Sequence, residues 1–137
     1  MSNPKEAIIR RYYEELFNRG RLELVSELLA PDYVNHSPGS PEQARGRDGV
    51  VEVVRALRLA FPDLQYIVED LVVGEHSVAA RTTMTGTHRG DFFGLPPTGK
   101  RFQVSQMAIE RFRGEAIVAH HRVTDELSLF KQLGVVP

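Results

Sequence analysis

The order of its periodicities is the feature that most constrains how this chain can fold. Apolar residues recur at helical spacing up to residue 61, and short β-rich runs begin at residue 64. The runs are joined by connections as short as "GEH" and "GE". Short connections favour antiparallel neighbours, and a block of helices before a block of strands is typical of α+β proteins. The sequence therefore predicts an α+β fold with a bent antiparallel sheet that has helices on its concave side.

Four helices are expected, three before the strands and one after them. The first begins at Asn3-Pro4, a capping residue followed by proline at the first helical position, and Gly20 stops it. The last lies between Asp125, which could cap it, and Gly134. The expected helices span residues 4–19, 21–30, 47–61 and 126–133, and the expected strands span residues 64–73, 77–88, 100–113 and 116–125.

Composition excludes several classes of protein. A chain of 137 residues suits a single domain, so residues 1–137 are expected to form one unit. A net charge of -1 gives no electrostatic reason to bind nucleic acid or an acidic membrane. Without cysteine there is no disulfide framework, and no apolar run approaches the roughly 20 residues that a spanning helix needs. The expectation is a cytoplasmic protein without a signal peptide.

The stretch "HHRVTDELSLF" (120–130) places two histidines and an aspartate where a strand pattern gives way to a helix pattern. Simple alternation along the last strand puts His121 and Asp125 on one side and His120 on the other. His121 and Asp125 are thus expected to face one cavity, although four residues of strand separate them. A structural role for Asp125, as the N-cap of the following helix, remains open.

Two further motifs are interpreted as structural. The five histidines form neither HxH nor HExxH spacing, so no metal site is expected. The glycine-rich "GTHRGDFFGLPPTGK" (86–100) contains Pro96-Pro97 and no helix pattern follows it, which favours a hairpin connection over a phosphate-binding loop. Its adjacent Phe92 and Phe93 cannot both be buried by strand alternation, so one is expected to cover a pocket entrance or a dimer partner.

Four stretches give the chain a resemblance to a known family over nearly its whole length. They are "YVNHSP" (33–38), residues 57–100 with the blocks "AFPDL" and "GTHRGDFFGLPPTGK", "IERFRGEAIVAHHRVTD" (109–125) and "LFKQLG" (129–134). They resemble the SnoaL-like polyketide cyclases, or predicted ester cyclases, of the nuclear transport factor 2-like superfamily. The resemblance implies a cone-shaped, cystatin-like fold in which a curved antiparallel sheet wraps around N-terminal helices, encloses an apolar pocket and usually forms a homodimer.

The same resemblance implies a chemistry. The family aspartate that matches Asp125 is the general acid/base of an intramolecular aldol condensation on a polyketide methyl ester, with no metal or cofactor. His121 stands where the family more often carries tryptophan, and it could donate to an enolate oxygen. The implied function is a cofactor-independent cyclase for a small polyketide-like or other apolar carbonyl substrate. Candidate substrate-binding residues are Tyr13, Phe17, His36, Phe61, Met84, His88 and Met107.

Two alternative functions remain at this stage. One is a noncatalytic module for small-molecule binding or dimerisation, a role that is common in the superfamily the chain resembles. Separately, an outer sheet face carrying valine, isoleucine and phenylalanine would be a reason for a dimer. The other alternative is an epoxide-hydrolase-like hydrolase, which needs an aspartate-arginine-aspartate set. Arg81 and Arg111 occur on expected strands, but neither has an assignable pair of inward aspartates.

Overall fold

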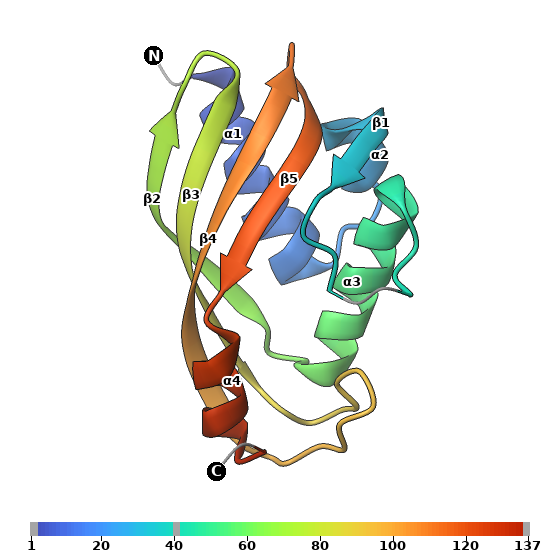
Figure 1. The fold of residues 1–137 in the computed structure, drawn as a ribbon, viewed down its shortest axis with the longest axis vertical. Helices are drawn as coiled ribbons and strands as arrows, with labels where there is room; N and C mark the ends of the chain where they lie inside the picture. Colours follow the sequence, from blue (N-terminus) through green and yellow to red (C-terminus); the bar gives the residue numbers. More distant parts are fainter. Residues whose placement is uncertain (1–2, 40–41, 136–137) are drawn as a thin grey trace.

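The computed structural model describes residues 3–39 and 42–135, and it confirms the α+β class. Figure 1 shows a strongly curved sheet with helices gathered along one side. Among the described residues, no helix is both long and apolar enough to cross a membrane. In chain order the elements are α1 (Pro4–Arg11), a π-helical segment η1 (Tyr12–Phe17), α2 (Leu24–Leu28), β1 (Leu29–Asn35), α3 (Gly46–Ala60), β2 (Gln65–Val73), β3 (Ser77–Thr87), β4 (Arg101–Arg113), β5 (Ala116–Thr124) and α4 (Glu126–Leu133).

The sheet has the strand order β1-β5-β4-β3-β2 and is mixed. The four expected strands pair antiparallel, whereas β1 pairs parallel with β5 at the edge. The prediction of helix over 21–30 was wrong at its end, since the helix stops at Leu28 and β1 begins at once. Pro31, which signalled only the end of a helix, lies exposed within β1. An edge strand tolerates a proline because half of its backbone groups have no partner strand.

The first helix changes its winding where it meets the core. Asn3 caps it, because its Oδ1 accepts a hydrogen bond from the backbone N–H of Lys5 at 2.9 Å. From Tyr12 the helix becomes π-helical, and the adjacent pairs Tyr12-Tyr13 and Leu16-Phe17 are all buried. A regular α-helix would turn one member of each pair away from the sheet, so the wider π turn lets this segment bury more aromatic surface.

Strands β4 and β5 differ in how closely they follow simple alternation. Along β4 every second residue is buried, and this inward set includes Gln106 and Glu110. In β5, Ile117 pairs with Phe112, but Ala119 pairs with Arg111, so one extra residue is inserted between them. Such a bulge exchanges the faces of all residues that follow.

The bulge reverses the expected faces of the second half of β5. His120 is buried, and it pairs with the inward Glu110. His121 is exposed and pairs with Ile109 on the outer face. The prediction that His121 points into the cavity was therefore wrong.

Helix α4 follows β5 directly and confirms the expected bounds. The Asp125 side chain accepts a hydrogen bond from the backbone N–H of Ser128 at 3.1 Å, which makes it the N-cap. Gly134 ends the helix in the left-handed region at φ 79°, where glycine has no steric penalty. Asp125 is exposed at this junction, so the expectation that it faces a cavity with His121 was wrong.

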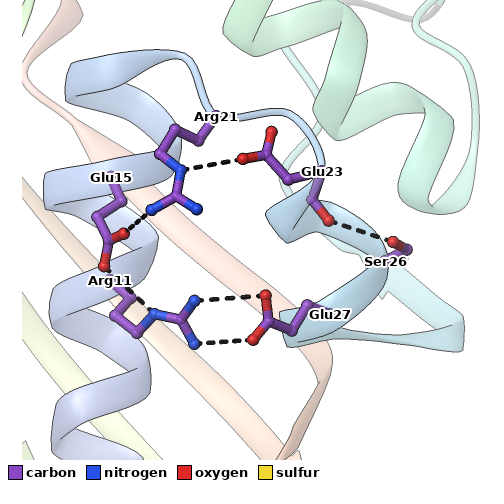
Figure 2. A network of polar contacts seen from close by, with 6 residues as sticks. All are labelled: Arg11, Glu15, Arg21, Glu23, Ser26 and Glu27. Atoms are coloured by element: carbon purple, nitrogen blue, oxygen red, sulfur yellow. Dashed lines mark hydrogen bonds and ion pairs between the residues drawn. The ribbon is translucent and has the colours of Figure 1, made fainter.

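An ion-pair network fixes the N-terminal helix against α2. Figure 2 shows the Arg11 guanidinium facing the Glu27 carboxylate, with N···O distances of 3.1 and 3.3 Å. Arg11 also contacts Glu15 at 3.2 Å, and Arg21 joins Glu15 to Glu23. Exposed ion pairs contribute little individually, but a two-pronged arginine-carboxylate contact restricts how the helices slide.

Burial raises the pKa of every tyrosine in the chain. The chain has four tyrosines, and each is at most 5% exposed. Tyr13 and Tyr66 pack with ring centroids 5.4 Å apart in an aromatic cluster with Tyr12 and Phe17. Loss of solvation raises the pKa of Tyr66 to about 12 and those of Tyr12, Tyr13 and Tyr33 still further.

These tyrosines should make the fold sensitive to alkali. Above about pH 10 the unfolded chain loses tyrosine protons that the folded chain retains, so stability falls as pH rises, by roughly 1.4 kcal/mol per pH unit for each tyrosine. Tyrosinate absorbance should therefore appear together with loss of circular dichroism. A normal tyrosine titration in a chain that stays folded would contradict this expectation.

Asp125 offers a test of the cap. Asp125→Ala should lower the free energy of unfolding by about 1 kcal/mol, because it removes the acceptor for the Ser128 N–H. Asp125→Asn should be nearly neutral, since asparagine caps helices as well as aspartate does. Chemical denaturation of both variants measures this. An equal loss in the two variants would show that the charge, and not the cap, is what stabilises the junction.

Candidate functional site

A cavity of about 520 Å³ lies between the inner face of the sheet and the helices. Its size is within the range of small-molecule sites. The π-helical segment, α3, the loop between β3 and β4, and α4 supply a mainly apolar wall, while β4 and β5 supply a polar patch. The apolar and aromatic lining residues are Tyr12, Tyr13, Phe17, Val53, Leu57, Tyr66, Met84, Phe92, Phe93, Leu95, Leu129, Phe130 and Val135, and the others are Gly39, Gln106, His120, Arg122, Thr124 and Glu126.

The structure brings only some of the expected substrate-binding residues to this cavity. Tyr13, Phe17 and Met84 line it. Phe61 and His88 are completely buried behind Phe92, at centroid distances of 5.0 and 6.3 Å from its ring. His36 and Met107 lie elsewhere: His36 stacks on His121 with centroids 4.5 Å apart, and Met107 is 60% exposed on the outer sheet face.

The loop between β3 and β4 closes one side of the cavity. Its base is a hairpin, as expected, because the N–H of His88 donates to the carbonyl of Lys100 and the N–H of Gly99 donates to that of His88. The His88 Nδ1 accepts from the Thr98 N–H at 3.3 Å and also contacts its hydroxyl at 3.0 Å. His88 thus holds the loop that presents Phe92 and Phe93 to the cavity.

A buried histidine-glutamate pair lies at the inner wall. His120 and Glu110 face each other across β4 and β5, and His120 Nδ1 is 2.5 Å from Glu110 Oε2. Their side chains are 4% and 0% exposed, so water does not screen the contact. Glu110 Oε1 has no hydrogen-bond partner among the residues that the structure describes. Burying a carboxylate is costly, so the contact with His120 is important for keeping Glu110 in the interior.

Arg122 contacts the ring nitrogen of His120 that faces away from Glu110. Its guanidinium lies 3.3 Å from His120 Nε2, and a guanidinium can only donate. A hydrogen bond from the guanidinium to Nε2 requires the tautomer in which the imidazole proton is on Nδ1, the nitrogen that faces Glu110. This is the arrangement of a general base, with the carboxylate positioned to stabilise the imidazolium that forms when Nε2 takes up a proton.

The remaining polar residues extend this patch along the strands. Thr124 donates from its hydroxyl to Gln106 Oε1 at 2.9 Å, in the cross-strand pair next to Arg122. Gln106, Arg122 and Thr124 all line the cavity. Within residues 3–39 and 42–135, no group of three or more histidine, cysteine, aspartate or glutamate side chains has an arrangement that could hold a metal ion.

Sequence analysis missed this patch, although one signal for it was present. Glu110 occupies a position of β4 that alternation assigns to the buried face, with Ala108 and Phe112 as its inward neighbours. A charged residue at an inward position is rarely tolerated without a partner. The bulge hid the partner, because simple alternation placed His120 on the opposite face.

Comparisons with known proteins agree with the architecture. The SnoaL-like polyketide cyclase family matches residues 7–133. The aklanonic acid methyl ester cyclase DnrD of Streptomyces peucetius is 30% identical over 132 residues, which are 93% of this chain and 88% of that protein. The nogalonic acid methyl ester cyclase of Streptomyces nogalater is 29% identical over 120 residues, 86% of this chain and 89% of that protein.

Solved structures are similar over almost the whole chain. TsrD from Streptomyces laurentii superimposes with a TM-score of 0.88 at 26% identity, covering 99% of both chains. IdmH from Streptomyces antibioticus has a TM-score of 0.84 at 36% identity, covering 97% of this chain and 100% of its own. The family match over residues 7–133 includes most of α1, the whole sheet and α4, so the chain belongs to the SnoaL-like polyketide cyclase family.

Proposed function

We propose that this protein is a cofactor-independent cyclase that closes a ring in a polyketide-like carbonyl compound by acid/base proton transfer. The observation that carries the proposal is the buried pair of His120 and Glu110. The His120 imidazole lines a mainly apolar cavity of about 520 Å³. Its family relatives named above are cyclases of polyketide methyl esters. Neither the noncatalytic module nor the hydrolase gains support from these relatives.

The reaction requires one proton acceptor that later becomes a donor. A carbon between two carbonyl groups is acidic, so His120 Nε2 takes its proton and leaves an enolate. The enolate carbon attacks a second carbonyl of the same molecule, forming the carbon–carbon bond and an alkoxide. The alkoxide then takes the proton back from Nε2, which restores the neutral imidazole. Glu110 stabilises the imidazolium between the two transfers.

The apolar wall contributes by folding the substrate. Bringing two ends of one molecule together can supply up to roughly 7 to 11 kcal/mol of the barrier in favourable cases. The aromatic side chains of η1 and of the loop between β3 and β4 both line the cavity. They are suited to hold a planar polyketide while its reacting carbons meet near His120.

The proposal assigns proton transfer to His120 and not to Asp125. His120→Gln should lower kcat by about a hundredfold or more, since glutamine can still donate to Glu110 but cannot accept a proton. Asp125→Asn is the matched control, because it changes the other candidate acid/base while keeping the helix cap. Ring closure of aklanonic and nogalonic acid methyl esters would be followed by absorbance and product analysis.

Circular dichroism and thermal unfolding would establish that both variants are folded. A loss of turnover in Asp125→Asn with full turnover in His120→Gln would reject the assignment to His120 and restore the role implied by family resemblance. Tight binding without turnover by the wild type would favour the noncatalytic module.

We also propose that the protein forms a homodimer through the outer face of its sheet. Exposed apolar side chains lie together there, since Met107 pairs with Val123 across the strands and Ile109 lies on the same face of β4 as Met107. Val123 is 77% exposed. Contiguous apolar surface of this kind is typical of interfaces between subunits.

Charge at this face should separate the subunits. Val123→Lys should shift the mass measured by light scattering from dimer to monomer, because a lysine would be buried opposite its own copy. Leu59→Lys is the control, since Leu59 is similarly exposed at 70% but lies on α3. A monomeric wild type, or a dimer unaffected by Val123→Lys, would contradict the proposal.

A further inference from the structure

We infer that a groove between the end of the first helix and α3 is a docking site for an acidic amphipathic segment of a partner protein. The groove has a volume of about 360 Å³. Its side chains are of two kinds, the arginines Arg19, Arg55 and Arg58 and the apolar Leu22, Val54 and Leu59. None of these residues lines the cavity beside His120, so this arginine groove is a separate site and does not depend on the proposed reaction.

The arginine groove gathers positive charge that the rest of the described chain leaves without a counter-ion. Arg19 and Arg55 are exposed, and Arg58 is half-buried. No carboxylate in residues 3–39 or 42–135 lies within 4.0 Å of any of the three guanidinium groups. Like charges that share a groove repel one another, so a partner that brings carboxylates is favoured and a cationic one is rejected.

The acidic side chains on the neighbouring elements are engaged elsewhere. Figure 2 shows that Glu15 and Glu23 both pair with Arg21, which does not line the groove. The Glu52 carboxylate of α3 accepts a hydrogen bond from the backbone N–H of Ala44 at 3.5 Å, toward the other end of that helix. The negative charge of these elements is therefore committed to other contacts.

Arg58 is already ordered in the groove. Its Nη1 donates to the backbone carbonyl oxygens of Phe17 and Asn18 at 3.0 and 2.6 Å, which satisfies the end of the first helix. Gly20 lets the side chain lie close, because a Cβ at this residue, which has φ 69°, would be 2.8 Å from Arg58 Nε. Only one of the three guanidinium nitrogens makes these bonds, so further N–H groups remain for a ligand. An ordered guanidinium loses little more freedom on binding.

The apolar side chains of the groove favour a peptide over a small anion. Leu59 is 70% exposed on α3, and Leu22 and Val54 line the same groove. An inorganic anion would pair with the arginines but leave this apolar surface in water. A segment with leucine on one face and carboxylates beside it would cover the apolar surface and pair with the arginines at once, as amphipathic helices do in grooves.

The groove lies where a partner can bind without entering the cavity. Helix α3 is on the concave side of the sheet in Figure 1, away from the outer sheet face. Val53 and Leu57 of this helix line the cavity, whereas Arg55, Arg58 and Leu59 line the groove. A bound partner would therefore contact α3 on a different face from the one that the cavity uses.

Two peptides that differ only in charge test the inference. The probe is a rhodamine-labelled twelve-residue peptide that repeats alanine, glutamate, glutamate and leucine, and its neutral match has glutamine in place of glutamate. By fluorescence anisotropy at about 50 mM salt, wild-type protein should bind the acidic peptide about tenfold more tightly than the neutral one, the gain expected from two or three exposed ion pairs. Salt at about 0.5 M should remove most of this preference.

Paired variants locate the binding. The double variant Arg19→Gln with Arg55→Gln should abolish the preference for the acidic peptide. Its matched control, Arg45→Gln with Arg47→Gln, removes the same net charge from the N-terminal end of α3, where cationic side chains oppose the helix dipole, and should keep the preference. Leu59→Gln should weaken binding of both peptides, because it removes the exposed apolar contact.

Equal affinity of the wild type for the two peptides, or no binding of either, would overturn the inference without any variant. An equal loss in the two double variants would overturn it too, because it would show unspecific attraction. Tripolyphosphate that binds through Arg19 and Arg55, in a protein that binds neither peptide, would assign the groove to a phosphate ligand instead. None of these measurements involves turnover, so the result stands whatever His120→Gln shows about the proposed function.

Discussion

The candidate site depends on one extra residue in β5. Between the pairs of Ile117 with Phe112 and of Ala119 with Arg111, the inserted residue turns the rest of the strand over. Without it, His120 and Arg122 would face solvent, and Glu110 would be a buried carboxylate with no partner. The bulge therefore gives the buried Glu110 carboxylate of β4 its partner, His120. It also places His120 and Arg122 on the wall of the cavity. It also turns His121 and Val123 outward, onto the exposed face of the sheet.

The buried pair is better explained by chemistry than by stability. Removing a carboxylate and an imidazole from water costs several kcal/mol before their attraction is counted, and apolar residues of similar size often stabilise a core as well or better. Most of the surrounding core is apolar, with Tyr13 and Phe112 among its buried members. A role for Glu110 in orienting His120 explains why the pair is present. The low polarity that makes burial of the pair costly also strengthens the hydrogen bond between Glu110 and the imidazole.

Capping and periodicity rules predicted those parts of the fold that depend on residues close together in the sequence. Asp125 and Gly134 marked both ends of α4. Local rules failed where tertiary packing decided the geometry. Pro31 was interpreted as a helix stop. A proline is tolerated in β1 only because this strand lies at the edge of the sheet, which the local sequence does not show. The faces of β5 depend on an inserted residue that no glycine or proline in the strand signals. The π-helical turn depends on how Tyr12 and Tyr13 pack against aromatic neighbours.

The same distinction explains why family resemblance is a better guide to the fold than to the reacting group. Capping α4 is a sufficient structural reason for an aspartate at position 125, whatever reaction the cavity supports. The inward positions of β4 and β5 are different, since a side chain there can change without altering the pairing of the strands. Gln106, His120 and Arg122 occupy three such positions and line the cavity, and Glu110 occupies a fourth, where it pairs with His120. Relatives that share the sheet and its curvature can therefore differ in acid/base group, and in this chain those positions hold a histidine with its carboxylate and a guanidinium beside it.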